Sequence, residues 1–122
     1  MTQAAEMSPS IVKSSEIVGV AVENSKNEKL GKINELVIDK LGGKVKYAVL
    51  TAGGILGLGE KLFALPWEIL KYHDDRECFV VDISKEKLKD SEGFDKDNWP
   101  DMADERWGKR IQDYYSSSTE GK

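Results

Sequence analysis

A run of short β-type segments between residues 17 and 82 constrains the fold more than any other feature of this chain. Each segment is rich in β-branched or aromatic residues, and tight polar or glycine-containing turns separate them. Five or six short strands at such close spacing are typical of a small β-barrel or β-sandwich. The predicted strands cover residues 17–22, 30–39, 45–51, 61–65 and 77–82, with a brief extension over residues 68–71.

The clearest strand covers residues 45–51, where Val45, Tyr47 and Val49 alternate onto one face. Gly42 and Gly43 precede it and tolerate the positive φ angles of a tight turn. We therefore predict a tight turn between this strand and the one before it. Trp67, which follows a proline at the end of the fourth strand, is predicted to be a core or barrel-rim aromatic residue.

The character of the chain changes near Ser84, which is predicted to cap one helical turn over residues 85–88. A final helix is expected after Asp101, its predicted N-cap. Four residues recur on one helical stripe, at i, i+4, i+8 and i+11: Ala103, Trp107, Ile111 and Tyr114. We expect this helix to pack its aromatic side on the β-domain or on a second subunit.

The chain of 122 residues is long enough for one domain, and its 39% hydrophobic residues are sufficient for one modest core. We predict a disordered leader over residues 1–13, a β-domain over 14–85, an extension over 86–115 and a disordered tail over 116–122. The first residues lack the basic and apolar regions of a signal peptide, and no apolar run approaches the ~18 residues that suggest a membrane span. We therefore expect a cytoplasmic protein without a membrane span.

The net charge of −4 opposes binding to nucleic acid, which normally needs a basic face. Acidic residues are mixed into the one lysine-rich stretch, so a solvated strand surface with edge lysines is favoured over a phosphate-binding stripe. That stretch contains Lys26, Lys29, Lys32, Lys40, Lys44 and Lys46. We expect no nucleic-acid partner.

The chain has few residues suited to catalysis. Cys78 is the single cysteine, which excludes an internal disulfide and a multi-cysteine metal site, and it is predicted to be a buried, inert thiol. His73 is the single histidine, and its neighbours Asp74 and Asp75 indicate a polar turn rather than a catalytic pair. We therefore expect a protein that is not an enzyme and that holds no cofactor and no metal.

The glycine-rich loop over residues 52–61 superficially resembles a phosphate-binding loop. Gly54 and Gly59 have the four-residue gap of that motif, but Glu60 stands where the motif needs lysine, and a strand follows instead of a helix. We interpret the glycines as a turn or bulge at a corner of the barrel. The apolar residues of this loop either form an interaction patch or, as we favour, cover one mouth of the barrel: Ile55, Leu56 and Leu58.

Residues 95–98 contain oxygen ligands that suggest a calcium loop. However, Trp99 falls where the third ligand of an EF-hand loop should be, and Pro100 follows it. A solvated linker is the favoured interpretation.

Five elements follow one another along the chain: Ser15 to Val22, Leu30 to Asp39, Gly43 to Leu50, the Gly53 to Gly59 loop and Leu65 to Leu70. In this order they resemble the PRC-barrel domain, which is named for the photosynthetic reaction centre H subunit and also occurs in the ribosome maturation factor RimM. The resemblance covers residues 14–85, and the terminal extension is similar to that of stand-alone bacterial members.

The resemblance implies a mainly β fold: a small, highly curved antiparallel barrel of five to six strands with a C-terminal helical extension. It also implies an adaptor role, because the H-subunit domain sits on an electron-transfer complex and the RimM domain contacts a ribosomal protein. The sequence contains neither the transmembrane helix of the H subunit nor the second barrel of RimM. Neither role is therefore transferred residue by residue.

Our first hypothesis is a homodimeric, non-enzymatic adaptor that docks on a larger complex or helps to assemble it. The alternatives are a photosynthetic electron-transport accessory, a ribosome or RNA-processing factor, and a small-ligand binder or enzyme that uses His73, Glu68 or Asp82. Tryptophan and tyrosine are favoured interface anchors, although the helical ones could equally dock within the chain. The candidate interaction surface comprises Ile55, Leu56, Leu58, Trp107, Ile111, Tyr114 and Tyr115.

Overall fold

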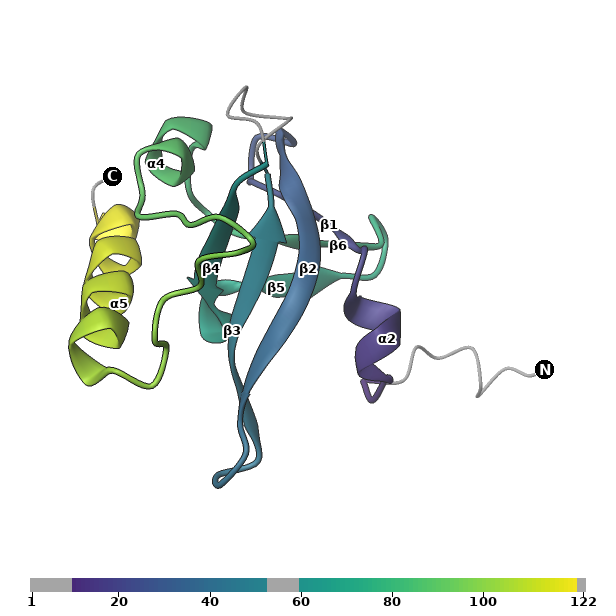
Figure 1. The fold of residues 1–122 in the computed structure, drawn as a ribbon. Helices are drawn as coiled ribbons and strands as arrows, with labels where there is room; N and C mark the ends of the chain where they lie inside the picture. The colour runs from purple at the N-terminus through teal and green to yellow at the C-terminus, as the bar shows by residue number, and fades with distance from the viewer. Residues whose placement is uncertain (1–9, 53–59, 121–122) are drawn as a thin grey trace.

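One six-stranded sheet organises the computed structural model, which describes residues 10–52 and 60–120 (Figure 1). The strands are β1 (Ala21–Glu23), β2 (Lys29–Asp39), β3 (Lys44–Thr51), β4 (Leu62–Pro66), β5 (Lys71–His73) and β6 (Cys78–Val80). The helical elements are α2 (Ser14–Ile17), the 3-10 turn η1 (Trp67–Ile69), α4 (Lys85–Lys89) and α5 (Glu105–Glu120). The chain is thus mainly β with a C-terminal helix, as predicted.

The sheet is mixed and open, with the strand order β4-β3-β2-β1-β6-β5. β1 and β6 run parallel, with Val22 opposite Phe79, so the prediction of a wholly antiparallel sheet is wrong at this pair. β4 and β5 are the outer strands and do not pair with each other, so the predicted closure into a barrel is not confirmed. The parallel pairing of β1 with β6 joins residues far apart along the chain, so no local sequence pattern predicts it.

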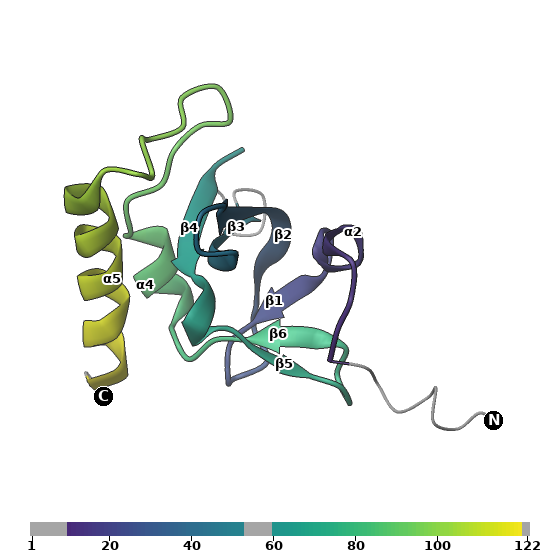
Figure 2. The same cartoon turned by 90° about the horizontal axis from the view of Figure 1, so that it is seen from below.

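The sheet curves strongly, and irregularities in β2 contribute to the curvature. The pairing between β2 and β3 shifts register between Ile33 and Glu35 and again between Val37 and Ile38. Such bulges bend a strand and increase its twist. Figure 2 shows the result: β2, β3 and β4 lie in one layer, and β1, β6 and β5 cross beneath them.

Most of the strand predictions are confirmed, and the errors lie at the start of the first strand and between β4 and β6. Residues 14–17 form a helical turn, not the start of a strand, because the Glu16 carboxylate accepts a hydrogen bond from the Lys13 N–H at 2.9 Å. The first strand therefore begins at Ala21. The brief extension predicted over residues 68–71 is replaced by η1 followed by β5.

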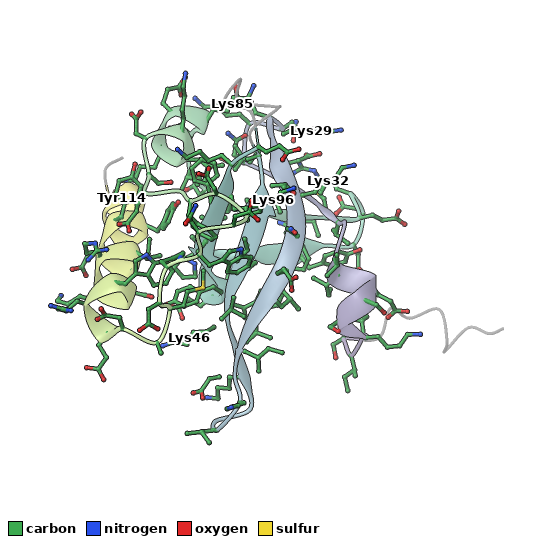
Figure 3. All side chains as sticks on the ribbon, in the orientation of Figure 1. Lys29, Lys32, Lys46, Lys85, Lys96 and Tyr114 are labelled. Carbon is green, nitrogen blue, oxygen red and sulfur yellow. The ribbon has the colours of Figure 1, made fainter. Side chains whose placement is uncertain are left out.

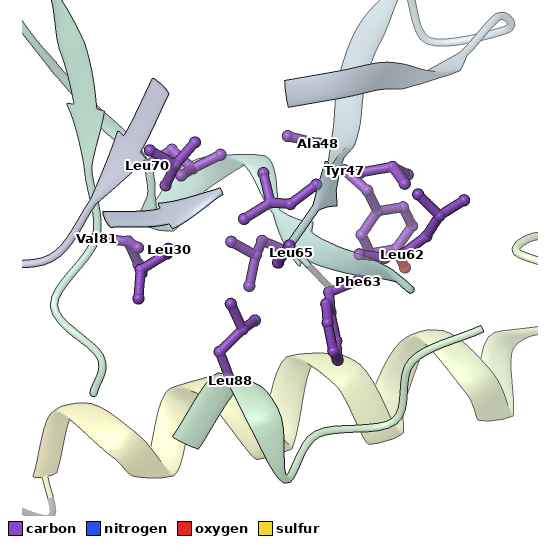
Figure 4. Close-up of a cluster of buried hydrophobic side chains, with 14 of the residues drawn as sticks. Leu30, Tyr47, Ala48, Leu62, Phe63, Leu65, Leu70, Val81 and Leu88 are labelled. Carbon is purple, nitrogen blue, oxygen red and sulfur yellow. The ribbon is translucent and has the colours of Figure 1, made fainter. Parts of the chain in front are cut away.

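The core occupies the concave side of the sheet and the space beneath α5 (Figure 4). Four consecutive residues of β3, from Tyr47 to Leu50, are all buried. Because successive side chains of a strand point to opposite faces, β3 must be covered on both sides. The Trp107 ring of α5 supplies one cover, since it meets the Tyr47 ring edge-on at 5.2 Å between centroids.

The extension covers part of the sheet. Ser84 caps α4 as predicted, and its hydroxyl accepts a hydrogen bond from the Lys87 N–H. The predicted cap at Asp101 is wrong: α5 begins at Glu105, and the Asp104 carboxylate accepts the Arg106 N–H at 2.9 Å. Between the two helices, Phe94 forms a backbone bridge to Leu62 and so protects one end of the outer strand β4.

Gly31 lies where β2 passes close to the end of β3. A Cβ atom at this position would stand 2.6 Å from the Thr51 carbonyl oxygen and 3.1 Å from the Ala52 Cβ. Gly31→Ala is therefore expected to lower the free energy of unfolding by about 1–3 kcal/mol through overpacking. Urea denaturation measures this change. The neighbouring exposed substitution Lys32→Ala should stay within about 0.5 kcal/mol of the parent, and an unchanged Gly31→Ala midpoint would contradict the assignment.

Candidate interaction site

The β2–β3 hairpin projects from the body of the molecule beyond the N-terminal end of α5 (Figure 1). We call residues 37–46 the arm. Its tip is fixed by local hydrogen bonds, because the Asp39 carboxylate accepts the N–H groups of Leu41 and Gly42, each at 3.1 Å. Gly43 adopts a φ of 73° and donates its N–H to the Asp39 carbonyl at 2.7 Å, which confirms the predicted turn.

The arm exposes apolar side chains. Leu41, at its tip, is 93% exposed, and Ile38 is 54% exposed. Removing a leucine side chain from water stabilises a structure by roughly 1.5–3 kcal/mol. A tip that is held rigid and presents such a residue is therefore suited to contact with another molecule.

A groove of about 690 Å³ lies between the base of the arm and the start of α5. Its floor includes Tyr47 and Gly108. A Cβ atom at position 108 would lie only 2.9 Å from the Tyr47 hydroxyl, so glycine at this position leaves room for the tyrosine. Both walls are mixed in charge, with a small positive excess on the arm side and a small negative excess on the α5 side. The arm side carries Asp39, Lys40 and Lys46, and the α5 side carries Asp104, Glu105 and Lys109.

The lysine-rich stretch forms two groups rather than one stripe. Lys40, Lys44 and Lys46 belong to the arm, whereas Lys29 and Lys32 lie toward the opposite end of β2 (Figure 3). All of them are exposed. The arm therefore combines positive charge with an apolar tip.

The structure places most of the predicted helical surface inside the chain's own core. Trp107, Ile111 and Tyr115 are buried in the same cluster as the sheet residues. Tyr114 is half-buried, and its hydroxyl donates to the Lys87 carbonyl of α4 at 2.6 Å (Figure 3). These residues dock α5 within the chain, and their use by a partner stays a prediction. The predicted loop residues of the same surface lie outside the described part of the chain: Ile55, Leu56 and Leu58.

The predicted helical stripe began at Ala103, which the structure places before α5 and exposed. Tyr115, which the stripe omitted, completes the buried face of the helix.

The sequence pattern missed the arm as a site, although one signal for it was available. The sequence predicts a turn here, and Leu41 stands next to its two glycines. An apolar residue in a turn cannot be covered by the strands beside it, so that position already pointed to an exposed tip.

The residues considered for catalysis are only partly brought together. His73 and Asp82 line a second, smaller cavity of about 300 Å³ with mainly apolar neighbours, but Glu68 lies elsewhere and accepts a hydrogen bond from Gln112. Cys78 is buried opposite His73, and burial raises the pKa of its thiol above the usual range, which disfavours the reactive thiolate. Within residues 10–52 and 60–120, no three His, Cys, Asp or Glu side chains are grouped to bind a metal ion.

The predicted position of Trp67 is confirmed, because its ring packs on the core 5.5 Å from that of Phe79. None of the helices in the described part of the chain combines the length and the apolar character that crossing a membrane requires.

The described part of the chain is thus a strongly curved, mainly β domain with a projecting arm and a docked C-terminal helix. The chain belongs to the PRC-barrel domain family, whose model matches residues 9–88. At the level of the family, this membership supports a role in protein interaction or as an adaptor. No match to a curated protein was found.

If α5 docks within its own chain, Trp107→Ala should be strongly destabilising. Loss of a buried tryptophan is expected to lower the free energy of unfolding by about 3–5 kcal/mol. Arg106→Ala, an exposed neighbour on the same helix, is the matched control and should change it by less than about 0.5 kcal/mol. Thermal or urea unfolding compares the two, and equal midpoints would show that the Trp107 pocket is not formed in the free chain.

The docked helix should also make the fold sensitive to alkali. Burial raises the pKa of Tyr115 well above its ordinary value, and burial likewise raises the pKa of Tyr47 and of Tyr114. The folded chain therefore keeps these protons where the unfolded chain releases them, so stability is complete below about pH 10 and falls as the pH rises further. Melting temperatures measured from about pH 9 to pH 11 should decline, and Tyr115→Phe should make the decline shallower. An unchanged slope in Tyr115→Phe would contradict this account.

Proposed function

We propose that this chain is a non-enzymatic interaction module that binds a protein partner through the arm, and so helps to dock or assemble a larger complex. The observation that carries the proposal is the rigid tip with Leu41 exposed beyond the body of the molecule. Membership of the PRC-barrel family supports the same role.

The chemistry of the arm favours a protein surface over other ligands. An apolar tip flanked by lysines fits a partner with an apolar pocket and acidic rim, which is an ordinary arrangement at protein interfaces. The cavity that contains His73 and Asp82 has a mainly apolar lining, and its cysteine neighbour is kept in the unreactive thiol form. Catalysis therefore has little support from the side chains, and we propose an adaptor that acts by binding alone.

A ribosome or RNA-processing partner is the second candidate, and the three arm lysines are the observation that favours it. The net charge of −4 opposes it. Binding that depends on phosphates would weaken steeply with added salt, whereas binding through Leu41 would not. Co-sedimentation with ribosomal subunits in low and in high salt separates the two candidates. A photosynthetic electron-transport role rests on the family resemblance alone.

Substitution of the arm tip tests the proposal. Leu41→Ser should weaken binding to the partner at least about tenfold, since it removes an apolar anchor worth more than 1.4 kcal/mol on burial. Ile11→Ser is the matched control, because Ile11 is 84% exposed and lies in the segment before α2, apart from the arm. Neither substitution should shift the melting temperature, because neither side chain is buried.

A photo-crosslinking amino acid placed at position 41, and at position 11 as a control, identifies the partner in extract of the native host. The proposal expects a defined protein adduct from position 41 only, and competition by the unlabelled parent chain but not by Leu41→Ser. Equal adducts from both positions, or equal competition by both serine variants, would contradict it.

A further inference from the structure

The chain carries two exposed surfaces of opposite charge. The arm contains three lysines and one aspartate. Residues 90–105, which we call the acidic segment, contain seven acidic residues and one lysine and lead from α4 to the first residue of α5. Each surface also presents an apolar side chain, since Leu41 is 93% exposed at the tip of the arm and Trp99 is 41% exposed in the acidic segment.

Part of the charge on each surface is not neutralised within the described chain. In the acidic segment, Glu92 pairs with Arg110 and Asp104 pairs with Arg106. Asp97, Asp101 and Glu105 have no ion pair among the residues that the structure describes, and neither do Lys40 and Lys44 on the arm. Both surfaces can therefore still form ion pairs.

The two surfaces border the same groove but do not cover each other. Asp39, Lys40 and Lys46 line the arm wall of the groove, and Asp104, Glu105 and Lys109 line the α5 wall, so the arm wall has a small positive excess and the α5 wall a small negative one. Leu41 also borders the groove, but the tip of the arm projects beyond the end of α5, and 93% of Leu41 stays exposed (Figure 1). Contact between the apolar tip and an acidic segment thus requires a second molecule.

We propose that the occupant of this site is a second copy of the chain, in a two-fold dimer in which the arm of each copy lies on the acidic segment of the other. This inference rests on the proposed function, because it names the partner of the same arm. A two-fold axis brings a surface against its complement twice and closes the assembly. Since the arm and the acidic segment border one groove, a single axis near that groove satisfies both contacts. A different acidic protein would cover the arm but leave uncovered the acidic segment and the exposed part of Trp99, whose ring packs on Phe94.

Charge reversal tests the dimer with two complementary variants. The arm variant carries Lys40→Glu and Lys44→Glu, and the segment variant carries Asp101→Lys and Glu105→Lys. Each variant alone places like charges together at both contacts, so its dimer dissociation constant should rise at least about tenfold relative to the parent chain. An equimolar mixture of the two restores opposite charges at both contacts and should form a one-to-one heterodimer. Sedimentation equilibrium measures the dissociation constants, and native mass spectrometry resolves the heterodimer by mass.

The matched control carries Lys29→Glu and Lys32→Glu, which produces the same net charge as the arm variant at the other end of β2 (Figure 3). It should dimerise as the parent does, and circular dichroism should show all variants folded. A chain with all four arm and segment reversals should dimerise again, because it restores opposite charges at both contacts. If the segment variant fails to fold, the arm variant and its matched control still test the dimer, since neither alters the segment.

A parent chain that stays monomeric at every concentration tested, a control as disruptive as the arm variant, or a mixture without heterodimer would overturn the inference. These failures differ from failure of the proposed function. If the parent is monomeric while position 41 cross-links to another protein, the arm is still a binding surface and only the identity of its partner is wrong.

Discussion

The docking of α5 on the sheet is the interaction on which the rest of the structure depends. β3 is buried on both faces between Tyr47 and Leu50, and a single curved sheet can cover only one of them. α5 packs against the neighbouring strand β4, with Ile111 and Tyr115 buried in the same core cluster, and Trp107 supplies the second cover at Tyr47. Trp107 does so although its indole N–H is buried without a hydrogen-bond partner in the described structure, an arrangement that usually costs about 1–3 kcal/mol. Apolar packing must therefore outweigh that cost.

The same docking determines where the functional surfaces lie. Once Trp107 is fixed against Tyr47, the first turn of α5 is held beside the base of the arm, and the two elements enclose the groove. Ion pairing and hydrogen bonding add to this placement, since Arg110 contacts Glu92 and Tyr114 contacts the carbonyl of Lys87. These contacts tie the beginning of the acidic segment, and α4 before it, to α5. The aromatic stripe of α5 suggested a surface for a partner. In the structure it docks the helix, and this docking positions the arm and the acidic segment, which are the surfaces exposed to a partner.

Local sequence patterns predicted most of the elements but not their long-range relations. The alternation around Tyr47, the glycine turn after Asp39 and the Ser84 cap are short-range signals, and each was read correctly. The parallel contact between Val22 and Phe79 was not, because it joins residues from opposite ends of the β-series. The start of α5 was misplaced because Asp101 and Asp104 are both plausible caps. In the structure the Asp101 carboxylate accepts a hydrogen bond from the Ala103 N–H, before the helix, and the Asp104 carboxylate accepts the Arg106 N–H of α5.

The candidate site was the hardest feature to predict, for a physical reason. The pattern of a helical stripe does not say whether an aromatic face meets its own sheet or another molecule, since both contacts require the same residues. Exposure becomes visible only when the rest of the chain is in place. Leu41 is informative because the turn that holds it is satisfied by Asp39 alone, so no packing requirement of the fold explains a large apolar residue at that position. A large apolar side chain that the packing of the fold does not explain, exposed to water beside lysines that form no ion pair within residues 10–52 and 60–120, is best explained by contact with another molecule.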